Sequence, residues 1–187
     1  METFTPQFFL TVFHLIGVAV GVGGAFFGDS LFFSATKNGI VSAQELRLLK
    51  RAGRFVWVGL FIIAVSGLGL FLLDFERYMA SSKFLAKMLI VLVVALNGIV
   101  FHTVHVPKLR RLVGVNLRES QLFKEASGGL FASGAVSVVS WLSALTLGSV
   151  RSLPFTLGQI MGAYALALAV AVLGASIMRC RFLRGAR

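Results

Sequence analysis

Five long apolar stretches occupy most of this sequence. They cover about residues 6–33, 55–73, 84–106, 129–148 and 156–178. Each is near the ~20 residues with which an α-helix crosses a hydrocarbon layer of about 30 Å. Inside a membrane a helix satisfies its own backbone polar groups, so a helix is the structure that these stretches predict. The sequence therefore predicts an all-α integral membrane protein, a bundle of five transmembrane helices.

The composition also indicates that lipid surrounds most of the chain. Of the 187 residues, 57% are hydrophobic and 13% are charged, whereas soluble domains carry about 25% charged residues. One membrane domain over residues 1–187 is the expected organisation. The net charge of +11 would suggest nucleic acid for a soluble protein. Here the basic residues flank apolar stretches, so we expect the lipid bilayer as partner and no nucleic acid.

The distribution of lysine and arginine predicts an orientation. Fourteen of the 18 lie in the first and third connections and the C-terminal tail, three lie in the second and fourth connections, and Lys87 lies inside the third stretch. Because basic residues collect on the cytoplasmic side, the N-terminus is expected outside and the C-terminus in the cytoplasm. The first stretch is longer than the apolar core of a signal peptide and has no basic residue before it, so we expect it to remain. The predicted location is the bacterial inner (plasma) membrane, with several passes.

Two of the basic connections contain helix signals. Ser42 and Glu45 fit a capping box, and leucines follow among basic residues. This pattern predicts a short amphipathic helix on the inner membrane surface. Residues 118–126 predict a second such helix.

Four glycines of the first stretch share a helical face with His14. They are Gly17, Gly21, Gly24 and Gly28. A stripe of small residues is typical of close helix–helix packing in membranes. It also leaves a flat wall for a planar ligand such as haem or a quinone, with His14 at its edge. The two interpretations are compatible, and the sequence leaves both open.

His14 and Lys87 are expected at similar depths in the outer half of the membrane. His14 lies about 12 Å, and Lys87 about 5 Å, inside the outer end of its stretch, at 1.5 Å per residue. Histidine is a common haem and metal ligand, although a lone membrane histidine is equally often only hydrogen-bonded. Lys87 either extends to the interface or attracts a propionate or carboxylate. We predict that the two side chains face one pocket between the first and third stretches.

Other ionisable residues lie near the inner side. His102 is about 22 Å from Lys87 along the same helix, so His102 and His14 are not expected to ligate one haem together. His102 and His105 are interpreted as interfacial residues. Asp29 is the one acidic residue well inside a stretch, and we expect it to pair with Arg54, with a proton relay as the alternative.

Uncharged polar residues recur in the last three stretches. A helical row of serines lies next to Trp141, and the set is Asn97, Ser133, Ser137, Ser140, Gln159 and Tyr164. Such residues predict hydrogen bonds between helices or the lining of a polar cavity. The single cysteine, Cys180, excludes an internal disulfide and a cysteine-based metal or haem attachment. No hydrolase triad, zinc-protease motif, P-loop or dinucleotide fingerprint is present.

Two runs resemble a known family. Residues 14–18 (HLIGV) and 84–92 (FLAKMLIVL) resemble the HemJ-type protoporphyrinogen oxidases and the CopD-like membrane domains, which are small bacterial helical bundles. The resemblance implies a haem b with His14 as axial ligand of the iron and Lys87 in the pocket. The chain departs from the HemJ pattern where Asn97 to His102 replaces a tyrosine–histidine pair. Its glycine run 21–25, followed by Asp29, is more similar to uncharacterised five-helix bacterial proteins.

Three functions follow as hypotheses. The first is a membrane oxidoreductase that handles haem b or another tetrapyrrole, with cofactor contacts from His14, Lys87, Gly17, Gly21 and Gly24. The second is a non-catalytic assembly or interaction subunit. The third is a small metal or proton transporter. The sequence leaves open whether the chain is an enzyme and whether it forms a homo-oligomer.

Overall fold

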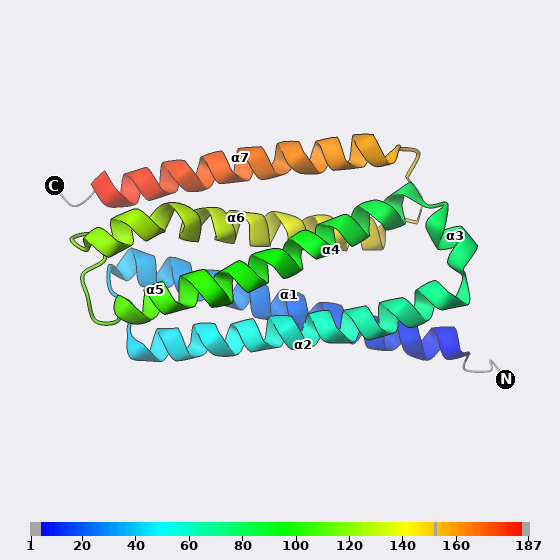
Figure 1. The fold of residues 1–187 in the computed structure, drawn as a ribbon, viewed down its shortest axis with the longest axis horizontal. Helices are drawn as coiled ribbons and strands as arrows, with labels where there is room; N and C mark the ends of the chain where they lie inside the picture. Colours follow the sequence, from blue (N-terminus) through cyan, green and yellow to red (C-terminus); the bar gives the residue numbers. More distant parts are fainter. Residues whose placement is uncertain (1–4, 152, 185–187) are drawn as a thin grey trace.

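The computed structural model describes residues 5–151 and 153–184, and these residues form a helical bundle (Figure 1). The helices in chain order are α1 (Pro6–Asn38), α2 (Ala43–Leu73), α3 (Phe75–Met79), α4 (Ser82–Val100), the π-helix η1 (Phe101–His105), α5 (Val106–Arg111), α6 (Gln121–Ser149) and α7 (Leu157–Arg184). Two isolated β-bridges are the only β pairing in the described part of the chain.

Five helical segments are long and apolar enough to cross a membrane, as predicted. They are α1, α2, the continuous segment α4–η1–α5, α6 and α7, and they contain between 28 and 33 residues. At 1.5 Å per residue they measure about 42–50 Å, which exceeds the ~30 Å of a hydrocarbon core. In a membrane, their ends would therefore extend into the headgroup regions.

Side chains cap most of the helix starts. Thr5 accepts a hydrogen bond from the backbone of Phe8, with Pro6 at the first helical position. Ser81 and Ser120 cap α4 and α6 in the same way. Such caps satisfy backbone N–H groups that have no partner inside the helix. The capping box predicted at Ser42 is also present.

The expectation of two separate surface helices is wrong. The box at Ser42 begins α2, which continues without a break to Leu73. Residues 121–126 are likewise the first turns of α6 and not a separate helix. The reason is packing, because Leu46, Leu49 and Ala52 face the protein interior and carry the helix onward from the cap. No proline interrupts either segment.

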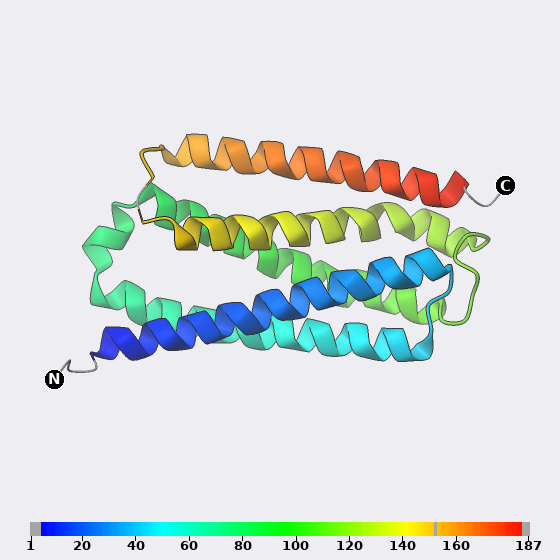
Figure 2. The same cartoon turned by 180° about the vertical axis from the view of Figure 1, so that it is seen from behind.

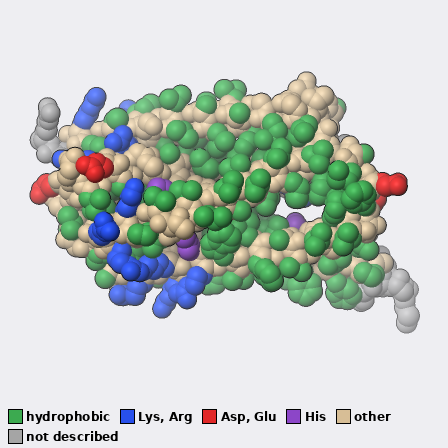
Figure 3. All heavy atoms as spheres, viewed as in Figure 1, with side chains coloured by type: hydrophobic (Ala, Val, Ile, Leu, Met, Phe, Trp, Pro, Cys, Tyr) green, Lys and Arg blue, Asp and Glu red, His purple; other side chains and the backbone are tan. Residues whose placement is uncertain are grey.

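The helices lie in two groups, as Figures 1 and 2 show from opposite sides. Helices α1 and α2 form an antiparallel pair, and α6 packs against α4 and α7. Helix α7 lies at the edge of the bundle, and the two termini are at opposite ends. Lysine and arginine side chains gather at the end that holds the C-terminus (Figure 3). We call this end the basic end.

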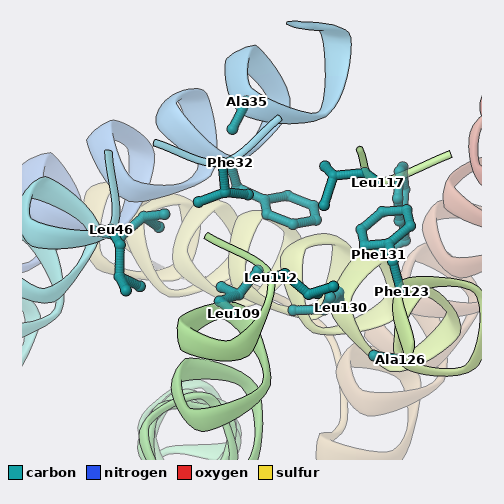
Figure 4. Close-up of a cluster of buried hydrophobic side chains, with 12 residues drawn as sticks. Phe32, Ala35, Leu46, Leu109, Leu112, Leu117, Phe123, Ala126, Leu130 and Phe131 are labelled. Atoms are coloured by element: carbon teal, nitrogen blue, oxygen red, sulfur yellow. The ribbon is translucent and has the colours of Figure 1, made fainter. Parts of the chain in front are cut away.

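The basic end holds the largest core cluster. Figure 4 shows its side chains, which come from α1, α2, α5, α6 and the connections: Phe32, Ala35, Val41, Leu46, Leu49, Leu109, Leu112, Leu117, Phe123, Ala126, Leu130 and Phe131. The two connections of this end are joined by backbone hydrogen bonds from Leu117 N to Gly39 O (2.8 Å) and from Gly114 N to Val41 O (2.9 Å). Gly39 and Gly114 both have positive φ, which glycine adopts without strain.

Candidate functional site

The glycine face of α1 packs against α2. Gly17, Gly21 and Gly24 are buried. A Cβ added at Gly17 would lie 2.9 Å from Ile62 Cγ2, and one at Gly24 would lie 2.9 Å from Ala52 O. This is the close helix–helix packing that the small residues predicted. At these positions α2, and not a planar ligand, covers the glycines.

Gly21 also faces a ring of α6. A Cβ there would lie 2.7 Å from Cη2 of Trp141, and a Cβ at Gly59 would collide with the backbone of Gly21. The prediction that this face is buried in the protein and not against lipid is therefore confirmed for Gly17, Gly21 and Gly24, whereas Gly28 is only partly buried. We call this close contact between α1 and α2 the seam. It fixes α1 on α2 and so determines which residues face each other farther along the two helices.

His14 lies on α1 beyond this seam, opposite Ser66 of α2. Its Nδ1 is 3.1 Å from Ser66 Oγ, and Ser66 Oγ donates to Ile62 O at 2.6 Å. A hydroxyl has one proton to donate, so Ser66 accepts from His14 and Nδ1 carries the hydrogen. In the neutral imidazole the lone pair then belongs to Nε2. With this assignment of the protons, the hydrogen-bond chain orients the ring and favours the tautomer with hydrogen on Nδ1.

Lys87 of α4 lies within electrostatic range of His14. Its Nζ is 5.9 Å from the centroid of the Phe84 ring. The only ion pair that the described residues form is Arg77–Asp74, so Lys87 has no acidic partner there. A cation inside a membrane span without a counter-charge is costly and is typical of a functional position.

Helices α2 and α4 contact each other on both sides of the His14 and Lys87 positions along the bundle. Phe71 and Phe84 stack with centroids 5.5 Å apart, and nearer the basic end a Cβ at Gly98 would lie 3.5 Å from Trp57. Figure 3 shows a hollow between these helices in the half away from the basic end, with a histidine side chain at its edge.

A second polar region lies nearer the basic end. It is an interior cavity of about 80 Å³ between α1, α2, α4 and α6. Its polar lining consists of Asp29, Asn97, His102, Ser133 and Ser137, among glycines and the rings of Phe32, Trp57, Phe101 and Trp141. We call this the interior cavity.

The expected pairing of Asp29 with Arg54 is wrong. The described residues contain no ion pair between them, because Arg54 is exposed on a different face of α2. Asp29 points toward α6, where Ser137 and Gly134 are its neighbours. Its Oδ2 is buried without a hydrogen-bond partner.

His102 and His105 belong to the π-helix η1. The N–H of Val106 bonds to Phe101 O, five residues back, and Pro107 follows. Proline has no N–H to continue the α-helical pattern, which accounts for the local widening. The Nδ1 atoms of both histidines are buried without a partner. His105 is 4% exposed, so its side chain is buried in the protein core, and its depth relative to the membrane interface stays a prediction.

The predicted interhelical hydrogen bonds are confirmed for two pairs. Asn97 and Ser133 bond α4 to α6, and Ser140 and Tyr164 bond α6 to α7 at 2.8 Å. Gln159 instead accepts from the backbone of Thr156 at the start of α7.

Sequence reasoning missed two contributions. Ser66 was overlooked, although it is a polar residue in the middle of an apolar stretch. The place of His102 beside the cavity was also missed. The signal in the sequence was the small residue Gly53 of α2. It lies opposite the His102 ring, where an added Cβ would collide with Cε1.

Comparison of the chain with protein-family models, curated proteins and solved structures gave no match. The resemblance to HemJ-type and CopD-like proteins therefore stays a prediction. In the part of the chain that the structure describes, no three His, Cys, Asp or Glu side chains are grouped to hold a metal ion. A haem differs from a bare ion in this respect, because the porphyrin supplies four ligands and the protein needs to supply one.

Proposed function

We propose that this protein binds a haem b or a related tetrapyrrole between α1, α2 and α4 and acts as a membrane oxidoreductase. His14 is the axial ligand of the iron, and Lys87 binds an acidic group of the ligand. The observation that carries the proposal is the chain from His14 Nδ1 through Ser66 Oγ to Ile62 O.

This chain supports the role of His14 as a ligand. Histidines that bind metals usually donate their other ring N–H to a neighbouring group, which fixes the tautomer and makes the free nitrogen more basic. Ser66 provides that neighbour, and its own hydroxyl is held by Ile62. The Nε2 lone pair is then available to iron.

The surroundings of Lys87 support the binding of an anionic ligand. Its ammonium group lacks an acidic partner among the described residues and lies near His14. A propionate would supply the missing charge through a charge-assisted hydrogen bond. Gly17, Gly21 and Gly24 contribute indirectly, because their packing on α2 holds Ser66 opposite His14.

A bound haem would supply one-electron chemistry, and the surrounding protein would set its potential. The residues of this chain hold and orient it. Ser66 fixes the imidazole, and Lys87 neutralises a carboxylate.

The test is an absorption spectrum of the full chain, purified in detergent from haem-sufficient cells. We expect a Soret band and, after reduction, an α-band. His14→Ala should remove both, and Lys87→Met should weaken haem retention. His102→Gln and His105→Gln are the matched controls and should keep the spectrum, with size-exclusion profiles checking the fold of every variant.

Two outcomes would contradict the proposal. One is a colourless wild-type protein, which would favour the non-catalytic assembly subunit. The other is haem that survives His14→Ala but is lost in His102→Gln, which would move the site away from His14 to the neighbourhood of η1.

A further inference from the structure

The interior cavity has room for water but not for a cofactor. Its volume of about 80 Å³ exceeds the roughly 10–15 Å³ that one water molecule needs. It is well below the ~300 Å³ at which pockets for drug-sized ligands begin. His14 and Lys87 do not line it, so it is distinct from the proposed haem site.

Two titratable side chains face this cavity, one from each side. Asp29 comes from α1, and His102 comes from η1. Each has a buried polar atom without a partner, Oδ2 of Asp29 and Nδ1 of His102. Unpartnered polar atoms beside a cavity of this size are the usual site of buried water.

The neighbouring polar groups do not satisfy these atoms. Asn97 Nδ2 donates to Ser133 O at 3.1 Å, and Ser133 Oγ donates to Asn97 Oδ1 at 2.9 Å. Asn97 and Ser133 therefore use these polar groups in hydrogen bonds to each other and not to Asp29 or His102. Ser137 lies near the Asp29 carboxyl group but leaves Oδ2 without a bond.

The other walls carry no titratable group. Helix α2 contributes Leu49, Ala52, Gly53, Val56 and Trp57, α4 contributes Val94, Asn97 and Gly98, and α6 contributes Leu130, Ser133, Gly134, Ser137 and Trp141. Outside the lining, His105 lies one turn along η1 against Gly129, and Lys108 acts on His105. No lysine or arginine lines the cavity, so an ionised Asp29 has no counter-charge on its walls.

We propose that Asp29 and His102 form a proton-binding site and exchange a proton through water held in the interior cavity. In the forward step the imidazolium of His102 gives its proton to a water molecule, and a water molecule protonates the Asp29 carboxylate. His102 becomes neutral and Asp29 becomes a neutral carboxylic acid, so the pair loses its charge separation without any electron transfer. The proton enters from solvent at the basic end, where η1 lies.

The geometry suits this exchange for two reasons. A neutral carboxyl group is the less costly form in a membrane interior that lacks a cation. His102 lies in the π-helix η1, and such π-bulges are frequent at functional sites. Uncharged Asn97 and Ser133 hold α4 against α6 and so keep the cavity open between them.

The test is infrared difference spectroscopy of the full chain in lipid nanodiscs, between acidic and alkaline buffer. We expect a carbonyl band of a buried, protonated carboxyl group that shifts in D₂O. Asp29→Asn should remove it, and His102→Gln should move the pH midpoint of the band. Glu119→Gln, which changes an exposed carboxyl group, is the control and should leave both unchanged.

Two results would overturn the proposal. One is a band that persists in Asp29→Asn while size exclusion shows a folded protein. The other is a pH midpoint that moves when sodium replaces choline at constant ionic strength, which would assign the cavity to a monovalent cation. The measurement needs no haem, so its outcome is independent of the proposed oxidoreductase function.

Discussion

Asn97 and Ser133 exchange two hydrogen bonds across the interface of α4 and α6. Asn97 Nδ2 donates to the Ser133 carbonyl at 3.1 Å, and the Ser133 hydroxyl donates to Asn97 Oδ1 at 2.9 Å. The carbonyl involved belongs to the backbone of a helix, so the contact fixes both the rotation and the height of α4 relative to α6. It is also one wall of the interior cavity.

Removal of this exchange should destabilise the bundle moderately. Asn97→Ala is expected to lower the free energy of unfolding by about 0.6–1.7 kcal/mol, the range measured for polar contacts between membrane helices. Ser133→Ala should cost less, because the bond from Asn97 to the backbone remains. Steric-trap unfolding in bicelles would measure both, and a double variant whose loss equals the sum of the single losses would contradict the coupling.

The seam between α1 and α2 predicts opposite effects of alanine at two glycines. A Cβ at Gly59 would meet the backbone of Gly21 and Gly17, whereas one at Gly23 would meet nothing within 4 Å. Gly59→Ala is therefore expected to destabilise the protein by about 1–3 kcal/mol through overpacking. Gly23→Ala should be neutral or slightly stabilising, since alanine favours a helix by about 1 kcal/mol over glycine. Equal melting temperatures for the two variants would contradict the close packing of α1 on α2 at Gly59.

The five spans were predictable because long apolar runs and helix caps are local signals. A capped helix start at Ser42 followed from four residues, although it was assigned to a separate short helix and not to the membrane helix α2. The length of α2 did not follow, because the continuation past Leu49 depends on packing against helices that are distant in the sequence. Because each stretch was interpreted without its packing partners, the sequence predicted separate surface helices in the basic connections.

The partners of buried polar residues were less predictable. Asp29 and Arg54 are at similar depth, but depth does not say which way a side chain points. The glycine seam rotates α1 so that Asp29 faces α6 and the interior cavity, while Arg54 remains exposed. His14 and Lys87 were expected to face one pocket on the same depth argument. Lys87 lies within electrostatic range of His14, and the shared pocket stays a prediction.

The proposed haem site makes Ser66 important. Ser66→Ala should lower haem affinity about 10–100-fold, because loss of a hydrogen-bond partner of a metal ligand has effects of this size. Ser176→Ala is a suitable control, since Ser176 is exposed and bonds only to Val172 of its own helix. Titration of the apoprotein with haemin would measure the difference. Equal affinities for the two variants would remove Ser66 from the site.

Arg179 should hold the basic end of α7 to α6. Its Nε donates to Ser127 Oγ at 2.7 Å, and its Nη2 donates to Lys124 O at 3.1 Å. Arg179→Lys cannot reproduce this forked geometry, and we expect a loss of about 1 kcal/mol, the typical size of one such hydrogen bond. Arg181→Lys alters an exposed neighbour and is the control. Protease sensitivity at the C-terminal end of α7 would report its loosening in the first variant only.

The orientation of the bundle can be tested with Cys180, the single cysteine. Cys180 is exposed and lies in α7 toward the C-terminus, at the basic end. If basic residues face the cytoplasm, a membrane-impermeant maleimide should label it in inverted vesicles and not in intact cells. Arg151→Cys in a Cys180→Ser background should show the reverse, because residue 151 is exposed in the connection at the opposite end. Labelling of Cys180 from outside intact cells would place the proposed haem site in the cytoplasmic half of the membrane and the interior cavity in the outer half.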